Sequence, residues 1–330
     1  MALDFWSTDR PLRILLDEYN ELLDLAIELG FDSVWAGEAR PQLPQAGHVP
    51  SPFLILAALA GRTELTIGTG VTLIPLWHPL QLAYDVAMLD HMSGGRFILG
   101  VGLGKPQVME RFGIDPRDGA ARMDETLAAL HRLWAGNDGF HGNHVRIDGG
   151  INPTPYRPGG PPIWVGGGVV RSIERAVEYG DAWYGSTAQH LSVIATQAER
   201  YRRLSAEQGR DPSRARVAIN RATFLASTDV EALTEGTPFV GSIVDFYAKR
   251  GLIDVSSASA DETGSIGDNV VFVGTPDTCV KSIRKYISVG VNHFNFRVAM
   301  ANMPPALVRR TVMLLGSEVL PRLRAEEDMK

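Results

Sequence analysis

The sequence predicts an α/β protein with a (β/α)₈ TIM-barrel fold, in which residues 1–330 form a single domain with insertions. Short apolar runs alternate with helical segments along the chain, and eight such runs can be counted. Most of these runs are continuous and do not alternate with polar residues, which is typical of parallel strands buried on both faces. The length of 330 residues also suits one barrel. An open, doubly wound parallel sheet is the alternative architecture.

Eight segments are expected to form the strands of the barrel, because each is an apolar run bounded by turn residues. They are residues 2–6, 31–38, 64–74, 96–102, 161–168, 181–186, 216–227 and 292–300. The third run contains Gly68 and Gly70, and glycine weakens a strand because it packs no side chain. A bulge or a close neighbour is therefore expected at this point of the chain.

The helices expected between these strands follow from apolar residues at helical spacing and from residues that begin or end helices. Gly30 ends the first helix, while Ser51 and Pro52 begin the second. The expected helices are residues 12–29, 51–63, 79–95, 119–136, 169–180, 190–209 and 276–290.

Two segments interrupt the alternation of strands and helices. Residues 137–162 are rich in turn residues and predict a small hairpin followed by a loop. Residues 227–269 separate the seventh strand from the eighth unit and contain at least one expected helix, at 241–251. Long insertions at the C-terminal face of a barrel form lids or substrate loops, and a surface excursion without function is the alternative.

Composition excludes several classes of function. The net charge of −6, from 32 Lys and Arg against 38 Asp and Glu, argues against nucleic acid and against an anionic membrane as partner. The chain has one cysteine, so it forms no internal disulfide. It has no signal-peptide pattern and no run of about 18 apolar residues. We expect a cytoplasmic protein.

The expected ends of the strands point to an aromatic ligand. In a barrel the site lies at these ends, and here they are rich in aromatic residues and glycine. Metal ligands are few, and His141 and His144 lie among turn residues without a neighbouring ligand cluster, so no metal site is predicted. The strand ends therefore suit a flat aromatic ligand better than a hydrolytic triad.

The stretch "WVGGGVVRSIERA" predicts a phosphate-binding turn. Gly166, Gly167 and Gly168 leave a strand and open a helix, so free backbone N–H groups face the mouth of the barrel. A tight turn without a ligand is the alternative. The stretch "GVGLGKP" lacks the spacing of a phosphate loop, because proline follows Lys105 where Ser or Thr is required.

Several motifs together resemble the luciferase-like monooxygenase superfamily. They are "LAIELGFDSVWAGE", "ELTIGTGVTLIPLWHPLQLAYDVAMLDHMSGGRFILGVGLG", "RMDETLAALHRLWAG", "PPIWVGGGVVRSIERAVEYGDAWYG" and "VGTPDTCVKSIRKYISVGVNHFNF". They cover nearly the whole chain in the order of the family. The resemblance implies a barrel that binds reduced flavin mononucleotide (FMN) or the deazaflavin coenzyme F420, and "GTGV" with "GVGLG" is more similar to the F420 branch.

The resemblance also assigns site residues. It implies a cis peptide bond between Gly70 and Val71 behind the central ring of the cofactor, with a plain bulge as the alternative. The bare position at Gly70 would leave room for that ring. The cofactor-binding residues would be Trp35, Glu38, Thr69, Gly70, Val71, Gly104, Val165, Gly166, Gly167, Gly168 and Val169. The substrate-side candidates are Trp6, Arg40, Trp77, His78 and Lys105.

Two positions depart from the pattern of the family. A catalytic histidine that many members carry after the second strand is missing, since the chain reads Glu38–Ala39–Arg40 there. Lys105 stands where the sugar-phosphate dehydrogenases of the family carry a glutamate that donates a proton. The candidate catalytic residues are therefore Glu38, His78 and Lys105. A Glu38 carboxyl buried beside the cofactor could act as general acid or base. The alternative is that it hydrogen-bonds to the cofactor ring or forms an ion pair within the barrel.

Three hypotheses of function follow. The first is a coenzyme F420-dependent oxidoreductase that transfers hydride to or from a small organic substrate. The second is a two-component monooxygenase that uses FMNH₂ from a separate reductase. The third is a barrel without catalytic activity, and a metal-dependent hydrolase ranks below it because the strand ends supply no ligand set. The resemblance implies a homodimer, and the substrate stays open.

Overall fold

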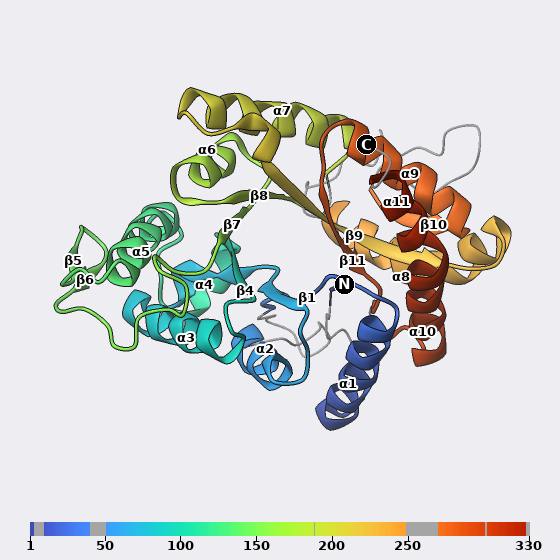
Figure 1. Ribbon diagram of the computed structural model, residues 1–330, viewed down its shortest axis with the longest axis horizontal. Coiled ribbons are helices and arrows are strands. Elements are labelled where there is room, and N and C mark those ends of the chain that lie inside the picture. Colours follow the sequence, from blue (N-terminus) through green and yellow to red (C-terminus); the bar gives the residue numbers. More distant parts are fainter. Residues whose placement is uncertain (3–9, 40–50, 188, 249–269, 301, 328–330) are drawn as a thin grey trace.

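The computed structural model describes residues 1–2, 10–39, 51–187, 189–248, 270–300 and 302–327. A curled, mainly parallel sheet lies at the centre, and helices cover its outer side (Figure 1). The predicted (β/α)₈ barrel fold is confirmed. Trp6, Arg40 and the whole polar end of the 227–269 insertion, residues 254–269, lie outside the described residues.

The sheet runs in the order β1, β2, β4, β7, β8, β9, and β11 then pairs with β9. Ala2 forms parallel bridges to Trp35 of β1 and to Arg297 of β11, so it joins the two ends of this path. The strands are β1 (Ser33–Ala36), β2 (Thr66–Thr69), β3 (Thr72–Leu73), β4 (Phe97–Gly102), β7 (Ile163–Gly166), β8 (Ala182–Gly185), β9 (Arg216–Leu225), β10 (Phe272–Gly274) and β11 (His293–Arg297).

Helices follow the strands as the sequence predicts, with some additions. The helices are α1 (Leu12–Glu28), α2 (Pro52–Ala60), α3 (Pro79–Met92), α4 (Pro106–Arg111), α5 (Gly119–Trp134), α6 (Val170–Tyr179), α7 (Leu191–Glu207), α8 (Asp229–Ala248), α9 (Pro276–Ser288), α10 (Pro305–Leu314) and α11 (Leu320–Glu327). The hairpin expected in residues 137–162 is confirmed, as β5 (Phe140–His141) pairs antiparallel with β6 (Arg146–Ile147). Helix α8 begins at Asp229, earlier than expected.

Two strand assignments differ from the prediction. The expected strand at 64–74 is divided into β2 and β3, both of which pair with β4. Ile67 pairs with Phe97 and Thr72 pairs with Val101, so β2 and β3 advance by five residues while β4 advances by four. The extra residue forms a bulge. Strand β10 was not predicted. It is only three residues long, and it pairs with the last part of β9, beyond the residues that pair with β11.

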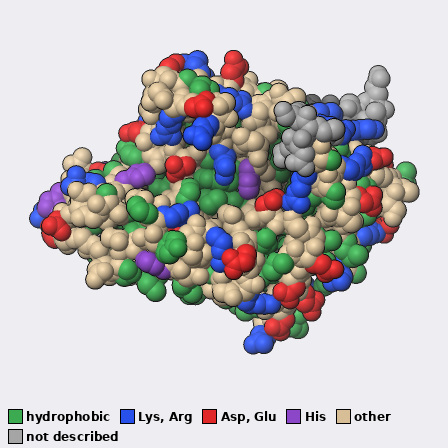
Figure 2. All heavy atoms as spheres, viewed as in Figure 1, with side chains coloured by type: hydrophobic (Ala, Val, Ile, Leu, Met, Phe, Trp, Pro, Cys, Tyr) green, Lys and Arg blue, Asp and Glu red, His purple; other side chains and the backbone are tan. Residues whose placement is uncertain are grey.

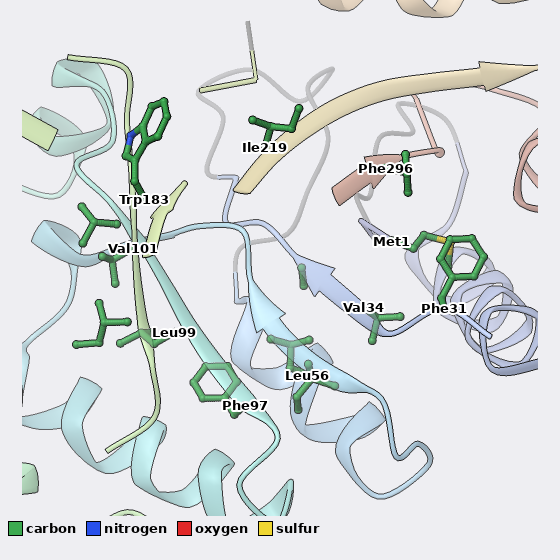
Figure 3. Packing of buried hydrophobic residues seen from close by; sticks show 14 of the residues in the cluster. Met1, Phe31, Val34, Leu56, Phe97, Leu99, Val101, Trp183, Ile219 and Phe296 are labelled. Atoms are coloured by element: carbon green, nitrogen blue, oxygen red, sulfur yellow. The ribbon is translucent and has the colours of Figure 1, made fainter. Parts of the chain in front are cut away.

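Two groups of buried side chains result from the alternation along each strand. Phe97, Leu99 and Val101 project from β4 toward the helices, where they join the larger core (Figure 3). The opposite faces of the strands enclose a second cluster inside the barrel: Trp35, Ile98, Trp164, Ala182, Tyr184 and Ala218. The indole of Trp35 lies 4.8 Å from that of Trp164, measured between ring centroids. This aromatic layer fills the barrel below its mouth.

The surface gives no sign of a membrane or of one dominant charge. On the face shown in Figure 2, basic and acidic side chains are interspersed, and hydrophobic side chains gather toward its centre. Among the described residues, no helix has the length and apolar character needed to cross a membrane.

His293 is a half-buried residue whose imidazole contacts the interior aromatic layer and whose Nε2 is enclosed by the protein. Its ring centroid lies 4.7 Å from that of Trp164 and 5.3 Å from that of Trp35. Burial, together with the positive charges of the N-terminal ammonium and Arg216, lowers the pKa of His293 to about 3. The folded protein therefore holds this imidazole neutral at physiological pH.

We predict that His293 makes folding sensitive to acid. The unfolded chain binds a proton at a histidine near pH 6.5, whereas the folded chain binds it only near pH 3. Between these values the unfolded state binds more protons, so the free energy of unfolding falls as pH drops, by up to about 1.4 kcal/mol per unit. In His293→Phe this contribution is absent, and urea unfolding at pH 7 to 4.5 measures it. The exposed His144→Gln is the control, and equal pH slopes for wild type and His293→Phe would contradict the prediction.

Candidate functional site

The bulge between β2 and β3 is fixed on both sides by backbone hydrogen bonds. The Gly70 N–H donates to the Ala36 carbonyl at 3.0 Å, and the Glu38 N–H donates to the Val71 carbonyl at 2.9 Å. The peptide bond between Gly70 and Val71 is cis, as predicted. The bulge is thus tied to the segment that follows β1.

Glycines on the neighbouring strands make room for this bulge. A side chain at Gly100 would overlap the Thr69 carbonyl. A Cβ at Gly102 would lie 2.7 Å from the Val71 Cγ2, and a Cβ at Gly166 would lie 3.0 Å from its Cγ1. The Thr69 hydroxyl also donates to the Gly100 carbonyl at 2.7 Å. Strands β4 and β7 therefore accept the bulge only because they carry glycine there.

The glycines of β2 itself lie against other side chains of this protein. A side chain at Gly68 would overlap the indole of Trp35. A Cβ at Gly70 would lie 3.2 Å from the Tyr184 hydroxyl and 3.4 Å from the Asn295 amide nitrogen. From the sequence, the bare position at Gly70 is expected to leave room for a cofactor ring. Instead, it accommodates the polar groups of Tyr184 and Asn295.

Glu38 holds the segment beyond the bulge. Its side-chain oxygen Oε2 accepts a hydrogen bond from the Leu73 N–H at 2.8 Å and from the Trp77 indole N–H at 3.1 Å. The carboxylate is buried, with 9% of the residue exposed. These contacts hold the carboxylate against the protein's own chain, and they bring two predicted residues, Glu38 and Trp77, together.

Other predicted residues lie further from this contact. His78 is exposed and directly precedes α3. Lys105 is half-buried, and its carbonyl accepts from the N–H groups of Val108 and Met109 at the start of α4. Trp35 lies in the aromatic layer with 1% exposed, and Val165 is buried in the core on the helix side of β7. Gly104 has a positive φ of 81° and a Cβ there would lie 3.5 Å from Leu73 Cδ1.

The turn between β7 and α6 is the second part of the site, and the protein binds the carbonyl groups of its last three residues. The Gly167 carbonyl accepts from the Trp183 indole N–H at 2.9 Å. The Gly168 carbonyl accepts from the Gln189 side-chain amide at 2.9 Å. The Val169 carbonyl accepts from the N–H and hydroxyl of Ser172 at 3.0 and 2.6 Å.

These contacts orient the N–H groups of the same turn. In a trans peptide the C=O and the following N–H point in opposite directions. The N–H groups of Gly168, Val169 and Val170 therefore point away from the groups that bind the carbonyls, and no acceptor in the described ranges takes them. Such a row of N–H groups at the start of α6, a helix of 10 residues, suits an oxyanion such as phosphate.

Cations beside this turn are already paired. Arg175 and Arg171 both donate to the Asp124 carboxylate, and Arg171 also pairs with Glu174. Burial raises the pKa of Asp124, but the two guanidinium groups outweigh it and hold that pKa below its ordinary value. An anion at the turn would therefore be held mainly by backbone N–H groups.

Several residues of the site were not predicted from the sequence. Tyr184 and Asn295 meet at the bulge, where the Asn295 amide donates to the Tyr184 hydroxyl at 2.7 Å. Gln189 and Gln197 bind the phosphate-type turn. Tyr184 stands at an expected strand end, which was a usable signal, whereas nothing in the spacing of the two glutamines marks them. Within the described ranges, no group of three His, Cys, Asp or Glu residues could hold a metal ion.

Comparison with known proteins confirms the resemblance. The sequence profile of the luciferase-like monooxygenase family matches residues 10–293. The chain is 29% identical to 4-hydroxyprotoasukamycin monooxygenase of Streptomyces nodosus subsp. asukaensis, which covers 80% of this chain and 75% of the relative. It is 31% identical to the oxygenase component of the flavin-dependent trigonelline monooxygenase of Acinetobacter baylyi, over 68% of this chain and 64% of the relative.

A relative that is named for coenzyme F420 matches over more of the chain than these two monooxygenases. The F420-dependent glucose-6-phosphate dehydrogenase of Nakamurella multipartita is 28% identical, over 93% of each chain. Among solved structures, the monooxygenase RslO1 of Streptomyces bottropensis superposes with a TM-score of 0.85 and 26% identity over 98% of both chains. Relatives of this chain thus include F420-dependent oxidoreductases and flavin monooxygenases.

We predict that Gly102→Ala destabilises the protein by about 1–3 kcal/mol, because the added methyl overpacks against Val71 Cγ2. Val71→Ala removes that methyl, so the double variant recovers most of the loss, and a double-mutant cycle by urea unfolding measures the coupling. Gly100→Ala is the matched control, since its methyl meets the Thr69 backbone carbonyl and Val71→Ala cannot relieve it. Additive effects of Gly102→Ala and Val71→Ala would show that the bulge is packed differently.

Proposed function

This chain belongs to the luciferase-like monooxygenase family, and on that premise we propose that it is a coenzyme F420-dependent oxidoreductase. It transfers hydride between the deazaflavin and a small organic substrate. The observation that carries the proposal is the β7–α6 turn, where the carbonyls are bound by the protein and no acceptor in the described ranges takes the N–H groups of Gly168, Val169 and Val170. A phosphate-bearing cofactor matches this turn.

The residues fit such a cofactor in two places at once. The turn of Gly166, Gly167, Gly168 and Val169 would hold the phosphate, and the Gly70–Val71 backbone would support the ring. Gly166 belongs to both places, because it starts the turn and a Cβ there would meet Val71. When bound, the deazaflavin supplies a ring carbon that accepts or donates hydride.

The residues of the chain then bind and orient the reactants. Glu38 holds Trp77 through the indole N–H, so that this ring forms one wall on the substrate side. His78 and Lys105 are the remaining described candidates for contact with substrate, and Trp6 and Arg40 are proposed for the same side from the sequence alone. Lys105 stands in place of the glutamate of the sugar-phosphate dehydrogenases, so glucose 6-phosphate is not the proposed substrate.

F420 is proposed over FMN because the stretches "GTGV" and "GVGLG" are more similar to the F420 branch of the family, and an F420-dependent relative aligns over 93% of both chains. The second candidate function is an FMNH₂-dependent monooxygenase supplied by a separate reductase. It is favoured by the relatives at 29% and 31% identity, which are both monooxygenases, and by the likeness to RslO1. The fold and the two binding places are the same for both functions.

A homodimer is proposed as well. Helices α2 and α3 leave Leu54, Met88 and Met92 exposed, at 74%, 49% and 49%. A second copy would remove these apolar side chains from water, and sedimentation velocity measures whether it does. The cytoplasm is the proposed location.

We predict that the purified protein binds F420 more tightly than FMN. A fluorescence titration of the apo-protein with each cofactor measures the two dissociation constants, and oxygen uptake with the reduced cofactor measures the competing chemistry. Tighter binding of FMN together with oxygen uptake would replace the first function by the second. Binding of neither cofactor at micromolar concentration would favour a barrel without catalytic activity.

We predict that Glu38→Gln lowers kcat by less than about tenfold and leaves the pH profile of kcat unchanged. The reason is that Glu38 accepts hydrogen bonds from Leu73 and Trp77, and the glutamine oxygen still accepts them. A general acid or base contributes about 10²–10⁴-fold and its loss removes one limb of the pH profile. Glu38→Ala, which removes both acceptors, is expected to change the fluorescence of Trp77 as well.

A further inference from the structure

The carbonyl of Gly168 is bound by two glutamine side chains from different elements. The Gln189 amide nitrogen, from the segment between β8 and α7, donates to it at 2.9 Å. The Gln197 amide nitrogen, from α7, donates to the same oxygen at 2.5 Å. The two amides thus both bind the Gly168 carbonyl oxygen. Without them, the peptide could rotate so that this oxygen faces the mouth of the barrel.

Binding of this carbonyl determines where the next N–H points. The Val169 N–H lies in the same peptide plane as the Gly168 carbonyl and points in the opposite direction. Rotation of this plane would replace the N–H by the carbonyl oxygen, which repels an anion. The amides of Gln189 and Gln197 oppose that rotation, and they do so without contacting the anion themselves.

The arrangement leaves other polar groups of the same residues without partners. The side-chain oxygens Oε1 of Gln189 and Gln197 are both buried and have no hydrogen-bond partner within the described ranges. A buried acceptor without a donor opposes folding. Selection for stability alone therefore does not account for two glutamines here, whereas the need to orient the Gly168 peptide does.

A buried arginine fixes the segment that carries Gln189. Arg221, which is 1% exposed, donates to the backbone carbonyls of Ser186, Thr187 and Gln189 at 3.3, 3.1 and 2.9 Å. Its guanidinium also lies 4.9 Å from the centre of the Tyr286 ring. Arg221 of β9 thus binds the backbone of Gln189, while the side chain of Gln189 binds the turn.

We propose that Gln189 and Gln197 are positioning residues for the phosphate group of the cofactor. They hold the Gly168 peptide so that the Val169 N–H faces the phosphate, and either amide alone keeps the carbonyl bound. The proposal rests on the function proposed above, because it requires a phosphate-bearing cofactor at the β7–α6 turn. It predicts an effect on affinity that depends on the phosphate and not on the ring.

The experiment compares cofactors that differ only in the phosphate-bearing part. Dissociation constants of FMN and riboflavin, or of F420 and its phosphate-free deazariboflavin, are measured for wild type, Gln189→Met, Gln197→Met and the double variant. Methionine keeps a similar volume and removes the N–H donor. We expect each single variant to lose about threefold or less in affinity for the phosphorylated form. The double variant is expected to lose about tenfold or more, as for one hydrogen bond to a charged group.

The phosphate-free forms provide the internal control, because their affinity is expected to stay within about twofold in every variant. The matched surface control is Gln81→Met on α3, where an exposed glutamine donates to Asp85 at 2.7 Å. If the double variant does not fold, the two single variants provide the test. The proposal then predicts that each of them has a lower ratio of affinity for the phosphorylated form to affinity for the phosphate-free form than wild type.

Several results would overturn the proposal. Equal losses for the phosphorylated and phosphate-free forms would mean that the glutamines only support the fold, and unchanged affinities would mean that the peptide keeps its orientation without them. A wild-type protein that binds both forms equally would remove the phosphate from the turn and would overturn the proposed function itself. The behaviour of the wild-type protein thus distinguishes the two failures.

Discussion

The arrangement of this barrel depends on a steric constraint at the bulge between β2 and β3. The Thr69 carbonyl takes the space that a side chain at position 100 would need, and the Val71 side chain takes the space of side chains at positions 102 and 166. Parallel strands in a barrel normally fill their inner faces with side chains. Here the bulge fills part of that space, so β4 and β7 must carry glycine at the positions that face it.

This constraint connects the two halves of the candidate site. Strand β7 carries Trp164 in the aromatic layer and Gly166 against Val71, and its chain continues directly into the turn that precedes α6. The proposed support for a ring, at the bulge, therefore packs directly against the strand that leads into the proposed support for a phosphate. A flat cofactor with a phosphate tail needs both supports at a constant separation, and a strand packed on both sides provides that rigidity.

The sequence predicts those parts of the molecule that local patterns determine. The apolar runs, the helical periodicity and the glycines at 166–168 led to the barrel and to the turn. The three-residue strand β10 could not be predicted, because it is too short to show a hydrophobic pattern and pairs only with the last residues of β9. The hydrogen-bond partners of Gly168 could not be predicted for a different reason, since Gln189 and Gln197 are 21 and 29 residues away along the chain. Contacts of that kind depend on how helices dock on the sheet.

The proposed supports for a cofactor and the insertion expected to act as a substrate loop lie in different segments of the chain. The bulge, its glycine neighbours and the turn all fall between Gly68 and Gly168, and the glutamines that hold the turn follow by Gln197. The expected substrate segment, 227–269, comes later in the sequence and joins β9 to the short β10 without taking part in those contacts within its described residues. Relatives with about 30% identity are named for different substrates, so the packing around Val71 and Gly168 does not by itself identify the substrate of this chain.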